Sequence, residues 1–239
     1  MPEFRYKLSV DVHDVDFNGV AKASSLMKYI QSAAQSQLTE VGLSYDELRA
    51  RNRAFIISRI KMEFSEPIRA YEVLTAISYP CESRGYSFLR CYALERDGVT
   101  IGRAASIWAL VDTESRALVP VKSFDLPLEL MPHNEMAIDH IVMPSGMTEV
   151  GEYLVGYAET DQNRHMNNTR YPDMYSSFLP MEDRRVRSMT IQYVNEAPMG
   201  ERLKVERAYE DGIYYLRTVR EDGKVNTLAT VELCDCKNC

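Results

Sequence analysis

The sequence predicts an α+β protein made of two tandem units, in which each unit packs one helix against an antiparallel sheet. Three observations support this prediction. A strand-like pattern near the amino terminus is followed by a long helical pattern and then by several strand-like runs. The same order recurs in the second half, and a repeat of this length indicates a duplicated domain rather than a solenoid. The chain has 239 residues, 45% of them hydrophobic, which is enough for two units with a buried core.

The first unit, residues 1–111, begins with a strand, because apolar and polar side chains alternate over residues 4–12. A helix is predicted for residues 21–41 from apolar side chains that recur at helical spacing. Strand-like runs then follow around residues 56–64, 73–79, 86–95 and 100–111. One long helix and several antiparallel strands give a layout in which the sheet buries the apolar stripe of the helix.

A second, short helix is predicted after the long one. Ser44 and Glu47 have the spacing of a capping box, and the helix that they begin reaches Arg51. The second unit has no counterpart of this element.

Residues 112–147 interrupt the regular patterns with four prolines and are predicted to be a linker that crosses between the units. The second unit, residues 148–239, again starts with a strand, around residues 149–158. Its helix carries Pro172 in the first turn, where a missing N–H is tolerated. Strands are predicted around residues 189–194, 202–209, 213–220 and 225–234.

The two units share an acid and an amide at the start of the helix. These pairs are Asp16 with Asn18 and Asp161 with Asn163, both at an offset of 145 residues. At the position of His165, however, the first copy has Val20. The first copy therefore keeps the scaffold, whereas the second keeps the reactive group.

A second match, at an offset of 129 residues, places Glu196 opposite Pro67. An ionisable group again stands only in the later copy. Each copy also carries an Asp-Gly dipeptide between strand-like runs, at 97–98 and 222–223, and such pairs predict tight hairpins.

Composition excludes several classes of function. The net charge of −7 and the pI near 5.3 disfavour broad binding to nucleic acid or anionic membrane. No apolar run reaches the length of about 18 residues that a membrane helix needs, and the amino terminus lacks a secretory pattern, so we expect a cytoplasmic protein. An acidic partner would need a local basic patch, and the candidates are Arg184, Arg185 and Arg187, whose alternative is a solvated loop or strand edge.

The five cysteines are odd in number and scattered, so no disulfide framework is predicted. Three of them, Cys234, Cys236 and Cys239, lie at the tail. They are either a metal clip or reduced thiols on a frayed terminus, and we expect the latter. No cofactor and no metal are predicted.

The polar cluster of the second copy is suited to chemistry. Its amides and acid can fix the tautomer of His165 and direct its N–H at a reacting oxygen. Asp161 and Asn163 also occur as turn formers, and Asn168 or Thr169 can serve as the helix N-cap. Glu196 is expected in apolar surroundings, which suit a carboxylate to deprotonate water near neutral pH. No nucleophilic-serine elbow, zinc motif or glycine-rich phosphate loop stands out.

These residues resemble the acyl-[acyl carrier protein] thioesterases of plants and bacteria, and the resemblance covers nearly the whole chain. It rests on the pattern Asp161-x-Asn163-x-His165-x-Asn167-Asn168 and on Tyr193-Val194-Asn195-Glu196, which is similar to the family's Tyr-x-x-Glu segment. It implies a double hotdog fold, in which each unit wraps a sheet around a long central helix. Plant members carry a cysteine directly after that Glu, whereas this sequence has Ala197, which argues against a cysteine nucleophile.

The resemblance implies hydrolysis of fatty acyl-[acyl carrier protein] to free fatty acid and carrier thiol, which ends fatty acid synthesis. Glu196 is then the general base for water, His165 assists or relays the proton, Asn163 orients the water or polarises the carbonyl, and Asp161 holds the loop. Substrate contacts are expected from Asn167 and Asn168, and the helix residues Leu26, Tyr29 and Ile30 are expected to line an acyl tunnel, although each is also an ordinary core position. The basic run Arg184, Arg185 and Arg187 is the candidate docking site for the carrier.

Two other readings of the residues stay open. One is a different hotdog enzyme, either a coenzyme A thioesterase or an enoyl-thioester hydratase, and the other is a non-catalytic acyl-binding module. Because duplication supplies within one chain the pairing that single units find by dimerising, either a monomer or a homodimer is compatible with the sequence.

Overall fold

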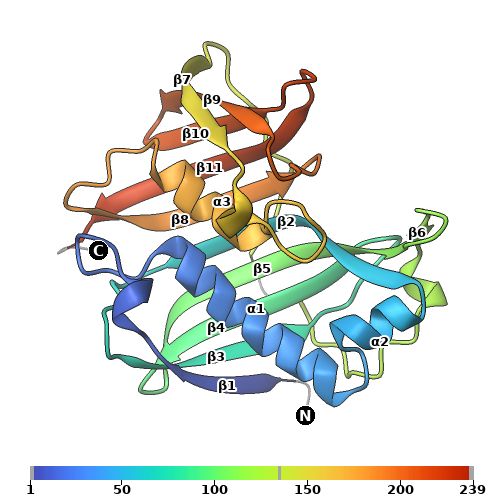
Figure 1. Ribbon diagram of the computed structural model, residues 1–239. Helices are drawn as coiled ribbons and strands as arrows, with labels where there is room; N and C mark the ends of the chain where they lie inside the picture. Colours follow the sequence, from blue (N-terminus) through green and yellow to red (C-terminus); the bar gives the residue numbers. More distant parts are fainter. Residues whose placement is uncertain (1–2, 134–135, 237–239) are drawn as a thin grey trace.

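The computed structural model describes residues 3–133 and 136–236 (Figure 1). In the first half, three helical segments and six strands follow the predicted order. They are β1 (Phe4–Ser9), α1 (Ala23–Glu40), α2 (Tyr45–Ala50), β2 (Arg53–Phe64), β3 (Val73–Pro80), β4 (Phe88–Arg96), β5 (Val99–Asp112) and β6 (Leu118–Val119), with a 3-10 turn at Val12–Asp14.

The second half repeats this order with one helix fewer. It contains β7 (Thr148–Leu154), α3 (Tyr171–Ser176), β8 (Arg184–Tyr193), β9 (Arg202–Glu210), β10 (Ile213–Val219) and β11 (Val225–Asp235). Short 3-10 turns lie at Tyr157–Glu159 and Asn168–Arg170, just before α3, and another, Val121–Ser123, lies in the linker.

One continuous antiparallel sheet joins the two halves in the order β1-β3-β4-β5-β2-β8-β11-β10-β9-β7. Counted outward from its centre, each half has the same sequence of strands, because β8, β11, β10, β9 and β7 correspond to β2, β5, β4, β3 and β1. The halves meet where β2 pairs with β8, with Ile60 opposite Ile191. This confirms the α+β class and the duplicated topology. The boundaries at 111 and 148 stay a prediction, because the sheet passes between the halves without a break.

The long helix α1 lies across the face of the first half-sheet (Figure 1). Its buried side chains recur at helical spacing and include Leu26, Met27 and Ile30, which pack into the main core. The helix ends in a Schellman motif, in which Gly42 has a φ of 71° and the Leu43 N–H donates to the Leu38 carbonyl at 2.9 Å.

The short helix α2 is confirmed together with its cap. The Ser44 hydroxyl accepts from the Glu47 N–H, while the Glu47 carboxylate accepts from the Ser44 N–H at 2.9 Å. This reciprocal pair satisfies two backbone donors and fixes where Tyr45, the first residue of the helix, lies.

The helix of the second half is shorter than expected, so the prediction of a long central helix in each unit is wrong for this half. Helix α3 has six residues, against 18 in α1. It stops near Ser177, whose hydroxyl donates back to the Asp173 carbonyl, and Pro180 disfavours helical backbone at the residue before it. A hollow of about 560 Å³ opens beside this end, lined by Val150, Ser177, Phe178, Leu179, Pro180, Arg207 and Tyr214.

The linker follows the sheet from one half to the other. The Met131 N–H donates to the Pro80 carbonyl at 2.9 Å, Arg59 donates to the Ile138 carbonyl, and the Ile141 N–H reaches Gln192 on β8 at 3.1 Å. These contacts attach Met131 to the end of β3, Ile138 to β2 and Ile141 to the second half.

Cys234 lies in β11 and Cys236 is buried, so the expectation of a frayed terminus is wrong for both. Cys239 lies outside the described residues. Within residues 3–133 and 136–236, no group of three or more metal-ligating side chains comes together. No helix in the same ranges is long and apolar enough to cross a membrane.

Candidate active site

The polar cluster of the second copy forms a tight turn directly before α3. The Asp161 carboxylate accepts from the Asn163 N–H at 2.8 Å, and the Asp161 N–H donates to the His165 carbonyl at 3.0 Å. Arg164, at the tip of the turn, has a φ of 63°, a left-handed backbone conformation that residues other than glycine rarely adopt. Its N–H donates to the Asp161 carbonyl at 2.9 Å. The turn therefore holds His165 by backbone bonds on one side.

The first copy contains the same turn. The Asp16 carboxylate accepts from the Asn18 N–H at 2.8 Å, and the Asp16 N–H donates to the Val20 carbonyl at 2.9 Å. Gly19 takes the left-handed position with a φ of 70°. The predicted correspondence between the two polar pairs is confirmed, and it shows that Asp161 has at least a structural role, since Asp16 makes the same bonds without a reactive neighbour.

A second segment anchors the turn in each copy. The Met166 N–H donates to the Ala197 carbonyl at 2.8 Å, and at the matching place the Ala21 N–H donates to the Ile68 carbonyl at 2.7 Å. Residue 165 of one segment also pairs with Pro198 of the other. This backbone pairing brings the imidazole and the carboxylate of Glu196 together across two segments that are 31 residues apart.

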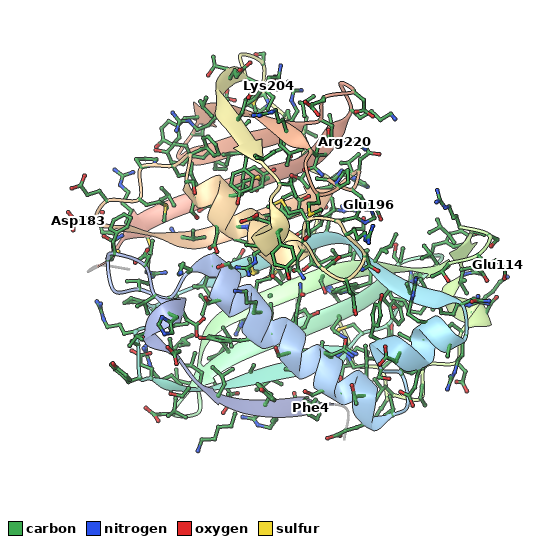
Figure 2. All side chains as sticks on the ribbon, in the orientation of Figure 1. Phe4, Glu114, Asp183, Glu196, Lys204 and Arg220 are labelled. Carbon is green, nitrogen blue, oxygen red and sulfur yellow. The ribbon has the colours of Figure 1, made fainter. Side chains whose placement is uncertain are left out.

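His165 and Glu196 form the central pair of the site. The imidazole Nε2 lies 3.3 Å from the Glu196 Oε2, so the two side chains form an ion pair when the imidazole is protonated. Figure 2 shows Glu196 beside the loop at the junction of the two halves. The first copy has Val20 and Pro67 at these two positions, so the pair has no counterpart there.

The surroundings of Glu196 differ from the apolar site that was expected. Its side chain is 68% exposed, whereas that of His165 is 34% exposed. The reason is that residue 196 follows the end of β8 and lies outside the sheet. Water can therefore reach the carboxylate directly, and the pairing with His165 replaces burial as the feature that distinguishes this Glu.

A buried polar network, which the sequence did not predict, holds the segment that carries Glu196. The Asn226 carbonyl accepts from the Asn195 N–H at 3.0 Å, and the Asn226 side chain donates to the Asn195 carbonyl and to the Tyr171 hydroxyl. Burial is the main cause that raises the pKa of Tyr171 to about 12. The hydrogen bond from Asn226 lowers this pKa, and the negative charge of Glu196 raises it further. The only sequence signal for this network is Asn226 itself, a polar residue within a strand-like run.

Asn163 reaches across to the first half of the chain, where the Tyr45 hydroxyl donates to its Oδ1 at 3.0 Å. Its amide nitrogen lies 3.5 Å from the Asp161 carboxylate. Tyr45 was not predicted, because nothing in its sequence context distinguishes it from a surface residue of α2.

Asn167 and Asn168 have different roles. The Asn167 Oδ1 accepts from both the N–H and the hydroxyl of Thr169, so Asn167 is the N-cap of the 3-10 turn. The Asn168 carbonyl accepts from the Tyr193 hydroxyl at 2.9 Å. The sequence expected the cap at Asn168 or Thr169, one or two residues later.

The three candidate tunnel residues lie in the first half. Leu26 and Ile30 are 4% and 2% exposed and belong to the main core, and the Tyr29 hydroxyl donates to the Asp14 carboxylate at 2.6 Å. All three therefore have a structural role, and their contact with an acyl chain stays a prediction.

The three arginines of the basic run do not lie on one exposed surface. Arg185 is buried, and its guanidinium donates to the carbonyls of Phe64 and Ser65 at 3.0 Å, so it joins the two halves and cannot form part of an exposed docking surface. Arg185 and the next residue, Val186, are both buried, because the pairing of β8 with β11 shifts register opposite Arg187 and breaks the alternation of side chains there. Arg184 and Arg187 are exposed, but Arg184 lies at the other end of β8 from Glu196, roughly 30 Å from Tyr193 at about 3.3 Å per residue.

Sequence comparison gives a consistent result over most of the chain. Residues 2–124 match the acyl-ACP thioesterase N-terminal domain, and residues 144–233 match the acyl-ACP thioesterase C-terminal domain. Among curated proteins, none matches the chain significantly.

Solved structures with the same architecture span almost the whole chain. An acyl-ACP thioesterase from Bacteroides thetaiotaomicron VPI-5482 superposes with a TM-score of 0.90 at 20% identity, covering 98% of each chain. A putative oleoyl thioesterase from Lactobacillus plantarum gives 0.84 at 18% identity, covering 98% of this chain and 96% of its own. The 12:0-ACP thioesterase from Umbellularia californica gives 0.83 at 16% identity, covering 98% of each. At these identities the likeness shows the fold, a double hotdog.

Proposed function

The chain belongs to the acyl-ACP thioesterase family, whose members are thioester hydrolases, and we propose that it releases a free fatty acid from the phosphopantetheine arm of acyl carrier protein. The observation that supports this most is the imidazole–carboxylate pair at 3.3 Å, which occurs only in the second copy. No cofactor is needed for this hydrolysis. The five cysteines, odd in number and scattered along the sequence, are compatible with a reducing, cytoplasmic location.

In this mechanism Glu196 takes a proton from water, and the water oxygen attacks the thioester carbonyl carbon. A carbon–oxygen bond forms, and the carbonyl electrons move to oxygen to give a tetrahedral oxyanion. When the carbon–sulfur bond breaks, the leaving thiolate receives a proton through His165, which relays it from Glu196 across the 3.3 Å contact. Water is consumed, and the products are a carboxylic acid and the carrier thiol.

Asn163 is suited to stabilise the oxyanion. Its carbonyl oxygen accepts from Tyr45, while among residues 3–133 and 136–236 its amide nitrogen has only the long contact of 3.5 Å to Asp161. The nitrogen can therefore donate to the substrate carbonyl as negative charge develops there. Asp161 supports this geometry through the turn, and Asn168 is a further candidate contact for the substrate.

A cysteine nucleophile is not part of this proposal. Residue 197, directly after Glu196, is a fully buried alanine, and its carbonyl is used to anchor the turn. Direct attack by water accounts for the residues that are present.

One assay tests the proposal against its rivals. Matched acyl-[acyl carrier protein] and acyl-coenzyme A thioesters are offered to the chain, and free thiol and free fatty acid are measured. Release that prefers the carrier thioester is the expected result. A preference for coenzyme A, hydration of an enoyl thioester, or binding without thiol release would each overturn it in favour of the corresponding alternative.

A further inference from the structure

The hydrogen bond from Tyr45 to Asn163 connects the first half of the chain to the candidate active site. It joins two side chains that are 118 residues apart in sequence, at 3.0 Å between the hydroxyl and the Asn163 Oδ1. The backbone of Tyr45 is well fixed, because this residue opens α2 directly after the reciprocal cap formed by Ser44 and Glu47. The guanidinium of Arg49 lies 6.0 Å from the centre of its ring. The first half thus presents a hydroxyl to the turn.

The matching asparagine of the first copy also reaches across to the other half, but with more bonds. The Asn18 Oδ1 accepts from the Asp183 N–H at 3.2 Å. Its amide nitrogen donates to the carbonyls of Met181 and Arg184 at 2.7 and 2.9 Å. Both ends of the Asn18 amide are therefore consumed in holding the segment between α3 and β8.

Comparison of the two copies defines the role of Tyr45. Its hydroxyl takes the place of the Asp183 N–H, since each donates to the carbonyl oxygen of the turn asparagine. The two carbonyls that saturate the amide nitrogen of Asn18 have no equivalent at Asn163 within the residues that the structure describes. The amide of Asn18 is therefore purely structural, whereas the amide of Asn163 is held at its oxygen by Tyr45.

The orientation of an asparagine side chain depends on its hydrogen bonds, because its oxygen and nitrogen ends are nearly equal in size. A donor at Oδ1 forces the nitrogen to point the other way. Without the hydroxyl, the amide of Asn163, which is exposed, can turn over and present an acceptor to the substrate. An acceptor would repel the negative charge that develops on the thioester oxygen.

We propose that Tyr45 is a positioning residue for thioester hydrolysis: it holds Asn163 with its amide N–H directed at the substrate carbonyl, and so makes the first half a functional part of the active site. This inference rests on the proposed function. It gives the first half, which carries Val20 and Pro67 at the two reactive positions, a role in the site.

The test is a double-mutant cycle with Tyr45→Phe and Asn163→Ala, measured as kcat and KM on an acyl-[acyl carrier protein] thioester. The ring of Phe keeps the packing and removes only the hydroxyl. Because loss of a whole oxyanion donor costs about 10²- to 10³-fold in kcat, loss of the group that orients it is expected to lower kcat roughly tenfold with KM nearly unchanged. In the Asn163→Ala background, Tyr45→Phe should have no further effect. Equal losses in both backgrounds would overturn the proposal.

Asn18→Ala is the matched control, because it removes the corresponding bonds between the halves at the inactive copy. It should lower the thermal midpoint and leave kcat unchanged, whereas Tyr45→Phe should lower kcat and leave the thermal midpoint unchanged. If both variants lose activity in proportion to stability, Tyr45 has only a structural role and the proposal fails.

A readout without turnover separates this inference from the proposed function. The side-chain amide of Asn163 is followed by ¹⁵N NMR in the full chain. Its two proton resonances should shift in Tyr45→Phe and keep their positions in Asn18→Ala. If the wild-type chain releases no thiol from any acyl carrier substrate, the proposed function fails, and an unshifted Asn163 amide in Tyr45→Phe would then also exclude the positioning contact.

Discussion

Replacement of Glu196 by Gln tests the proposed base while keeping its size and shape. The amide can still approach His165 at the 3.3 Å that separates the two side chains, but it cannot accept a proton from water. Because the Glu196 side chain is 68% exposed, the change should not disturb the fold. Exposed ion pairs contribute about 0–1 kcal/mol to stability, so the thermal midpoint is expected to change little.

The expected loss of activity is much larger than the loss of stability. A positioned general base contributes about 10²- to 10⁴-fold to the rate, which corresponds to roughly 3–5 kcal/mol of the activation barrier. Solvent access and the remaining His165 favour the lower half of this range, so we expect kcat for acyl-[acyl carrier protein] to fall about 10²- to 10³-fold. KM should stay within a few-fold of the wild-type value, since the carboxylate acts in the transition state rather than in binding.

The assay is release of free thiol under saturating substrate, with Glu152→Gln as the matched control. Glu152 lies in the same half, its side chain is 59% exposed, and it is 3.9 Å from Arg202, so it is a similar exposed ion pair without a role in the site. It should keep wild-type activity. Glu196→Gln with more than a third of wild-type kcat would remove Glu196 from the chemistry.

Three further results are expected. Ile30→Ala should destabilise the fold by about 2–5 kcal/mol, because Ile30 is 2% exposed. If α1 borders the acyl chain, the product profile of this variant should move to longer fatty acids, and an unchanged profile from folded protein would show that the acyl chain does not contact Ile30. Arg164→Gly introduces at the left-handed position the glycine that the first copy has there, so the free energy of unfolding should stay within about 1 kcal/mol of the wild-type value. KM for the anionic carrier substrate should rise, and its dependence on salt should weaken. An unaltered KM would exclude contact between Arg164 and the carrier. Burial raises the pKa of Tyr171 to about 12, above its ordinary 10.0, so the stability that this group contributes is fully present below pH 10 and is lost as the pH rises toward 12. Urea unfolding of the wild type and of Tyr171→Phe between pH 10 and 12 should show up to about 3 kcal/mol more loss of stability in the wild type. Parallel curves of stability against pH would contradict the raised pKa.

Much of the fold could be predicted because its signals are local. Alternation along the strands, the Ser44 capping box and the spacing of apolar residues in α1 each depend on neighbours within a few residues. The internal repeat added long-range information, since Asp16 and Asp161 mark the same turn. The length of α3 was not predictable in this way, because residues after Ser177 continue an apolar helical pattern and leave the helix only through tertiary packing and Pro180.

The site was predictable to the extent that its residues cluster in sequence. His165 and Glu196 were identified because each differs from the first copy at a matched position, and the structure brings them to 3.3 Å. Tyr45 and Asn226 were missed, since their partners are far away in sequence and their own contexts are ordinary. Arg185 was misread because a run of arginines looks uniform in sequence, whereas the structure buries Arg185 and exposes Arg184 and Arg187, where the pairing of β8 with β11 shifts register.

The most direct test of the proposed active site uses the first copy as a template for inactivation. His165→Val with Glu196→Pro gives the second copy the residues that the first copy carries at these two positions. The measurement is the rate of free thiol release from an acyl-[acyl carrier protein] thioester by this double variant, with circular dichroism to confirm folding. We expect a folded chain whose rate of release is at least about 10³-fold below that of the wild type, and release near the wild-type rate would contradict the proposed mechanism.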